Sequence, residues 1–139
     1  MAGNTQPIFS QVADIQFSKG ATAANTTTDL TSGTIYLAFT ADATNGGYVQ
    51  RIRLRPLGTN SNPTVARLWI NNGAATSTGT NNCLFDEISI AASTSNNAAS
   101  LSNYELPLNF ALPPGYRLYV TLGTAAAAGF DISVIGGKY

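Results

Sequence analysis

The chain has 139 residues, of which only 10% are charged, and its formal net charge is zero. This length suits about one domain, and the neutral balance argues against a general nucleic-acid binder, which would be basic. The sequence contains no histidine, which removes the usual general base, the commonest metal ligand and the usual pH switch.

Residues 1–13 show no alternating pattern, and we predict that they form an N-terminal arm rather than part of the domain. Pro7 keeps its surroundings extended. Three apolar side chains in this segment are candidates to dock on a neighbouring molecule: Ile8, Phe9 and Val12. The domain itself is expected over residues 14–139.

From residue 14 onward, short alternating segments separated by Gly, Asn, Thr and Pro turn signals indicate β-strands, and no long amphipathic helix is evident. The expected strands are 14–18, 34–40, 47–56, 64–71, 83–91, 104–110, 116–122 and 130–135. Eight such strands with long polar loops predict an all-β, eight-stranded antiparallel jelly-roll sandwich. In that fold the first, eighth, third and sixth strands share one sheet, and the second, seventh, fourth and fifth share the other.

The segment 47–56 has the clearest pattern. Because side chains alternate between the two faces of a strand, Ile52 and Leu54 are expected in the core, and three arginines on the outer face. These are Arg51, Arg53 and Arg55. They form a candidate basic face for phosphate or an acidic partner; the alternative is a solvated face neutralised by Glu105 and Asp131.

The same rule predicts an aromatic outer face on the second sheet. In 34–40 it places Leu37 toward the core and Tyr36 outside. The residues expected on this face are Tyr36, Arg67, Trp69, Phe85, Arg117 and Tyr119. Aromatic residues and arginine are enriched at protein interfaces, so we expect a subunit or capsid interface here. The alternatives are a carbohydrate-stacking platform and a register shift that buries Trp69.

No catalytic, metal or cofactor site is predicted. Asp86 and Glu87 are adjacent on a strand and face opposite ways, so they cannot flank one bond. Alternation points Asp86 inward, which is unfavourable unless it lies at the rim or beside a bulge. Asp42 reads as a plain turn residue rather than a calcium ligand. Cys83 is the single cysteine, and without a histidine to activate it we expect a small buried hydrophobe.

Two phrases, Tyr-Val-Gln-Arg-Ile-Arg-Leu-Arg-Pro at 48–56 and Leu-Pro-Leu-Asn-Phe-Ala-Leu-Pro-Pro-Gly-Tyr-Arg-Leu at 106–118, resemble small virion proteins of tailed bacteriophages. With segments 34–40 and 67–71 and the Ala/Asn/Thr/Gly-rich loops, the chain resembles jelly-roll capsid decoration proteins, also called cement proteins. The likeness covers roughly residues 14–139 and lies in composition, strand pattern and size.

The resemblance implies a homotrimer on the outer capsid surface that bridges capsomers, made in the bacterial host cytoplasm and partnered by the major capsid protein. It implies no enzyme activity, no cofactor, no nucleic acid and no membrane. The same likeness extends to tail and fibre proteins, so the alternative function is a receptor- or carbohydrate-binding head domain, with Trp69 and Tyr119 stacking on sugars.

Overall fold

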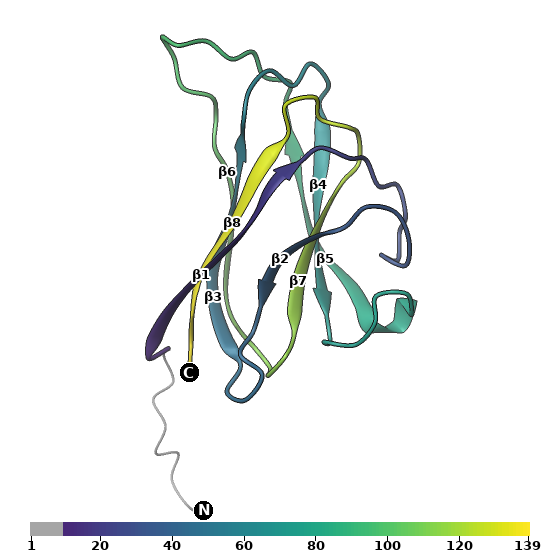
Figure 1. Ribbon diagram of the computed structural model, residues 1–139, viewed down its shortest axis with the longest axis vertical. Helices are drawn as coiled ribbons and strands as arrows, with labels where there is room; N and C mark the ends of the chain where they lie inside the picture. Colours follow the sequence, from purple (N-terminus) through teal and green to yellow (C-terminus); the bar gives the residue numbers. More distant parts are fainter. Residues whose placement is uncertain (1–9) are drawn as a thin grey trace, which may run out of the picture.

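The computed structural model describes residues 10–139, which form eight β-strands and one short 3-10 helix (Figure 1). The strands are β1 (Val12–Ala21), β2 (Tyr36–Thr40), β3 (Gly47–Pro56), β4 (Thr64–Asn71), β5 (Asn82–Ile90), β6 (Tyr104–Leu112), β7 (Arg117–Leu122) and β8 (Phe130–Lys138). The helix, η1 (Gly79–Asn81), lies in the loop before β5. Within this part of the chain no helix is long and apolar enough to cross a membrane.

The strands form two four-stranded antiparallel sheets in the predicted order. The first sheet runs β1-β8-β3-β6 and the second runs β2-β7-β4-β5. This wiring confirms the jelly-roll sandwich. It also places β1 and β2 at one edge of the sandwich and β6 and β5 at the opposite edge, which matters for the surfaces described below.

The core lies between the sheets and comes from the inward positions of the alternating strands. Ile52 and Leu54 of β3 are fully buried, as predicted from the alternation with the arginines. Val49 is also fully buried, because the register of β3 shifts between Val49 and Arg51. These three residues pack in one cluster with Phe39 of β2 and with apolar residues of β4, β7 and β8. Full burial of each such side chain contributes about 1.5–3 kcal/mol.

Bulges shift the alternation in several strands. In β2 the register to β7 shifts between Leu37 and Phe39. Ala38 and Phe39 are therefore both buried, Leu37 is 45% exposed, and Tyr36 packs against the core. The predicted inward position of Leu37 is wrong for this reason.

A second bulge resolves the position of Asp86. The β4–β5 register shifts between Leu68 and Trp69, and Asp86 lies on β5 at the edge of its sheet. Asp86 is exposed, because it lies on an edge strand and beside a bulge. The carboxylate therefore stays hydrated and avoids the free-energy cost of burying a charge.

The first strand begins earlier than predicted. Val12 pairs with Lys138 and Ala13 with Gly137, and Gln11 N donates a hydrogen bond to Lys138 O at 2.8 Å. β1 therefore starts beside the C-terminal end of β8 (Figure 1). Val12 belongs to the sheet and not to an arm, so the boundary at residue 14 is wrong by two residues. Ile8 and Phe9 lie outside the described residues.

Candidate functional site

The outer face of the second sheet is not the open aromatic surface that alternation predicts. Trp69 is 1% exposed and Tyr119 is 8% exposed, and both pack against Leu30 of the β1–β2 loop (residues 22–35). Trp69 does point outward from β4, but this loop covers it. The indole Nε1 donates to Thr121 Oγ1 at 3.0 Å, which satisfies its polar atom under the cover.

One buried side chain, Asn25, holds this loop in place. Its Nδ2 donates to the carbonyls of Ser32 and Thr34 at 2.9 and 3.0 Å. Its Oδ1 accepts from the backbone N–H and the hydroxyl of Thr27 at 2.9 and 2.7 Å. Leu30 sits in the middle of the loop with a left-handed φ of 63° and is 1% exposed. A leucine in this unfavourable backbone region indicates that burying its side chain over Trp69 outweighs the strain.

The other residues expected on that face have separate environments. The hydroxyl of Tyr36 accepts hydrogen bonds from the N–H groups of Thr22 and Ala23. Phe85 is 47% exposed and packs edge-on against Phe110, with ring centroids 5.1 Å apart. Arg117 is half-buried at the start of β7. The six predicted interface residues therefore do not form one exposed surface.

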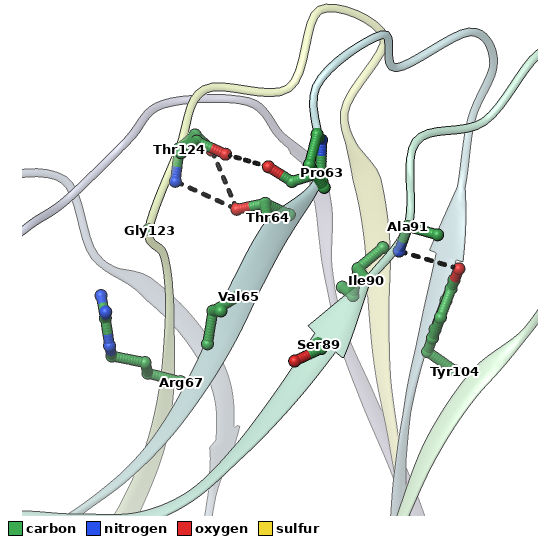
Figure 2. A pocket seen from close by; sticks show the side chains of 10 residues that line it. All are labelled: Pro63, Thr64, Val65, Arg67, Ser89, Ile90, Ala91, Tyr104, Gly123 and Thr124. Carbon is green, nitrogen blue, oxygen red and sulfur yellow. Dashed lines mark hydrogen bonds between the residues drawn. The ribbon is translucent and has the colours of Figure 1, made fainter.

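A cleft that the sequence did not indicate lies where β4 begins and β5 ends (Figure 2). Its open volume is about 620 Å³. The lining residues come from four separate segments: Pro63, Thr64, Val65, Arg67, Ser89, Ile90, Ala91, Tyr104, Gly123 and Thr124. Because these segments meet only in the folded chain, no local sequence signal marks the cleft.

Most polar groups of this cleft already have partners within the chain. Thr64 Oγ1 donates to Thr124 O, and Thr124 Oγ1 donates to Pro63 O at 2.7 Å (Figure 2). The Tyr104 hydroxyl accepts from Ala91 N at 3.2 Å. Arg67 Nε donates to Glu87 Oε1 at 2.8 Å, and this guanidinium stands at the side of the cleft next to Gly123. The cleft therefore suits an apolar group rather than a heavily hydroxylated ligand.

The three arginines of β3 lie on the outer face of the first sheet, as predicted, and Glu105 of β6 pairs with two of them. Arg51 and Arg53 both form ion pairs with this carboxylate. Arg55 instead donates to Leu101 O and to Asn103 Oδ1. Asp131 lies opposite Arg55 in the register but accepts a hydrogen bond from Gly20 N at 3.1 Å. Glu105 therefore forms the expected ion pairs with two arginines, whereas among residues 10–139 the hydrogen bond to Asp131 comes from Gly20 and not from an arginine.

In residues 10–139 no three His, Cys, Asp or Glu side chains are grouped to hold a metal ion. Backbone N–H donors from Asn45 and Thr44 lower the pKa of Asp42, which is the geometry of a turn-forming carboxylate. Cys83 is exposed on the edge strand β5, so its predicted burial is wrong.

The clearest surface feature is a set of large exposed hydrophobic side chains. They are Val12, Ile15, Phe17, Leu37, Leu57, Leu84 and Phe85. Ile15 and Phe17 lie on β1, and Leu84 and Phe85 lie on β5, so the pairs occupy opposite edges of the sandwich. Alternation indicates that β1 has one apolar and one polar face. Which of these faces points away from the core is determined by how β1 pairs with β8.

No family model and no curated protein matches this chain. Among solved structures, this chain is similar to a chain of the cyanophage Pam1 capsid asymmetric unit, with 15% sequence identity and a TM-score of 0.43. The similarity covers 98% of this chain and 91% of that chain. A likeness of this degree does not establish a family.

Proposed function

We propose that this chain is a structural protein of a tailed-bacteriophage virion, and within that class a capsid decoration protein that stabilises the head at junctions between capsomers. It would have no catalytic role and need no cofactor. The proposed partners are the major capsid protein and further copies of the chain in a homotrimer. The proposed location is the outer capsid surface, after synthesis in the host cytoplasm.

The observation that carries this proposal is the placement of apolar side chains at both edges of a neutral jelly roll. Phe17 is 70% exposed and Ile15 is 62% exposed. Only 10% of the residues of the chain are charged, so few charges surround these apolar side chains. Exposed apolar groups on such a surface are typical of a protein that buries it against others. The virion-like phrase 48–56 coincides with β3, and the phrase 106–118 spans β6 and the start of β7.

The cleft beside Arg67 is a second feature that favours binding to a protein. Its open volume of about 620 Å³ is lined by apolar atoms of Val65 and Ile90, and the hydroxyl groups of Thr64 and Thr124 are already bonded within the chain. A partner's apolar side chain would fill it without breaking the hydrogen bonds of these two threonines. We place one contact with the capsid here, and we assign residues 1–9 the role of the capsid-binding arm.

The alternative of a carbohydrate-binding head domain depended on Trp69 and Tyr119 as stacking platforms. Both rings are covered by the β1–β2 loop and cannot stack on a sugar in this conformation. That version of the alternative is therefore withdrawn.

Cosedimentation of the purified protein with purified heads of its phage tests the proposal. We expect saturable binding that weakens when Ser89, which is exposed in the cleft, is changed to arginine. Leu57→Ser is the matched control, because Leu57 is exposed but lies outside the cleft. Absence of the protein from both bound heads and intact virions would exclude a decoration role.

A further inference from the structure

The edge strand β1 is built with its apolar side outward. Ile15 and Phe17 are 62% and 70% exposed, whereas the half-buried positions between and beside them are the polar residues Asp14, Gln16 and Ser18. Gln16 fixes this orientation, because its amide bonds to the N–H and the carbonyl of Thr40 at 2.8 Å each. Edge strands usually carry charges that discourage association. On β1 the exposed charge, Lys19, lies beyond Phe17, and the two exposed positions before it are apolar, which marks a surface that association would cover.

The apolar side of β1 continues across the first sheet into the arginines. The register aligns Ile15 with Ile135 and Ile135 with Arg51. The next row aligns Phe17 with Ser133 and Ser133 with Arg53. We call this surface, defined by Ile15, Phe17, Ile135, Arg51 and Arg53, the β1 face. Its two arginines share the single carboxylate of Glu105, so the β1 face keeps an excess of positive charge.

The opposite edge of the sandwich carries a second, different apolar surface. Leu84 and Phe85 of β5 are 43% and 47% exposed, and Phe85 packs on Phe110 of β6. Asp86 follows directly and is also exposed. We call this surface, defined by Leu84, Phe85, Asp86 and Phe110, the β5 flank. Among the described residues the ion pairs involve Glu105 and Glu87 but not Asp86, which leaves the flank an unpaired negative charge.

We infer that the β1 face of one copy binds the β5 flank of a second copy. Both surfaces combine exposed apolar side chains with a charge, and the charges have opposite sign, positive from Arg51 and Arg53 and negative from Asp86. Apolar groups would then cover each other while the charges pair at the margin. The chain is neutral overall, so no net repulsion opposes the contact.

The position of the two surfaces determines the kind of assembly. They are different patches on opposite edges, so the contact is heterologous, and each copy has one of each to offer. Heterologous contacts close into rings or continue as filaments. This inference refines the self-association within the proposed function, and it replaces the covered face around Trp69 as the subunit contact. It does not require capsid binding.

Complementation between two variants tests the heterologous contact. Phe17→Ser removes the β1 face and leaves the β5 flank, and Leu84→Ser does the reverse. Sedimentation velocity on the full chain should show wild-type self-association at concentrations up to about 100 μM. Each variant alone should associate about 10- to 100-fold more weakly. An equimolar mixture should recover one intact contact and form a 1:1 dimer that stops there.

The controls separate this contact from loss of folding and from other occupants. Leu57→Ser removes an exposed leucine outside both surfaces and should leave association unchanged. Circular dichroism should show the same β-sheet spectrum for all variants, since each substitution is at an exposed position. A monomeric wild-type chain, or a mixture that fails to form the 1:1 dimer, would overturn the inference. Loss of association on deletion of residues 1–9 would also overturn it, because the covering group would then be the chain's own N-terminal segment. Head binding by a monomeric chain would leave the proposed capsid role standing while this contact fails.

Discussion

The indole Nε1 of Trp69 donates to the hydroxyl of Thr121 at 3.0 Å, and Leu30 closes over the pair. This relationship joins three segments that are far apart in the sequence: the β1–β2 loop, β4 and β7. It forms a small second core on the outside of the β2-β7-β4-β5 sheet. The loop is thus part of the folded domain and not a flexible connection.

The first prediction concerns Leu30. Replacing it with alanine removes the side chain that covers Trp69 and should lower the free energy of unfolding by about 2–4 kcal/mol. Trp69 is the single tryptophan, so its fluorescence should shift to longer wavelength as the ring meets water. Leu57→Ala, at a position 46% exposed, should change stability by less than about 0.5 kcal/mol. An unshifted emission spectrum in Leu30→Ala would show that the loop does not depend on this contact.

The second prediction concerns Asn25. Asn25→Ala leaves the carbonyls of Ser32 and Thr34 and the Thr27 donors without their buried partner. We expect destabilisation of about 2–3 kcal/mol, together with faster acrylamide quenching of Trp69. Asn96→Ala is the matched control, because Asn96 makes similar local bonds to Ala98 and Ala99 in an exposed loop. Equal effects of the two substitutions would refute a special role for Asn25.

The third prediction concerns Glu105. Its ion pairs with Arg51 and Arg53 involve side chains that are about one-third to two-fifths exposed, so solvent screens them. Glu105→Gln should lower stability by less than about 1 kcal/mol, and the small difference should shrink further in high salt. Urea denaturation at low and high ionic strength measures this. A large, salt-independent loss would mean that Glu105 acts through packing instead.

The fourth prediction concerns pH. Hydrogen bonds from Asn45 and Thr44 lower the pKa of Asp42 below its usual 3.8, and hydrogen bonds from Thr31 lower the pKa of Asp29 in the same way. A carboxyl whose pKa is lower in the folded state than in the unfolded state adds stability above its unfolded pKa and loses it as the pH falls through the folded pKa. Stability should therefore decline below about pH 4 and stay nearly flat between about pH 5 and 7, because the chain has no histidine.

Denaturant midpoints measured across this range check the prediction. Asp42→Asn should reduce the loss of stability below about pH 4, and stability should still change little between about pH 5 and 7. A steep change between about pH 5 and 7 would contradict the account, since the chain has no histidine to titrate there.

The fifth prediction concerns the N-terminus. Deletion of residues 1–9 should leave the thermal transition nearly unchanged, because the described hydrogen bonding to β8 begins at Gln11. Deletion of residues 1–13 should lower the transition, because it removes Val12 and Ala13 from their pairs with Lys138 and Gly137. Head binding should weaken in both deletions if residues 1–9 act as the arm. Identical thermal transitions for the two deletions would place the first strand later than Val12.

The parts of the fold that follow from local alternation were predictable. In β3 the alternation of Ile52 and Leu54 with the arginines correctly predicted which face of the strand is buried. The number of strands and the spacing of the turns led to the sheet order that the structure shows. A jelly roll has a fixed wiring, so eight strands recognised as such determine which of them are neighbours.

The parts that depend on long-range packing were not predictable. The cover over Trp69 comes from Leu30, 39 positions earlier in the chain, and nothing in a polar loop marks one leucine as a lid. The sequence gives no signal for bulges either. The extra residue in β2 turns Leu37 outward, although the segment 34–40 alternates regularly. The exposure of Ile15 and Phe17 follows from where β8 pairs with β1, and that register is a property of two strands at once.

A cryo-electron microscopy difference map would show directly whether this chain is part of the capsid surface. Phage heads would be imaged with and without this protein, from wild-type virions and from virions lacking its gene. The account predicts jelly-roll-sized density on the outer capsid surface at the junctions between capsomers, present only with the protein. Identical head maps, or density for this chain only on the tail, would contradict it.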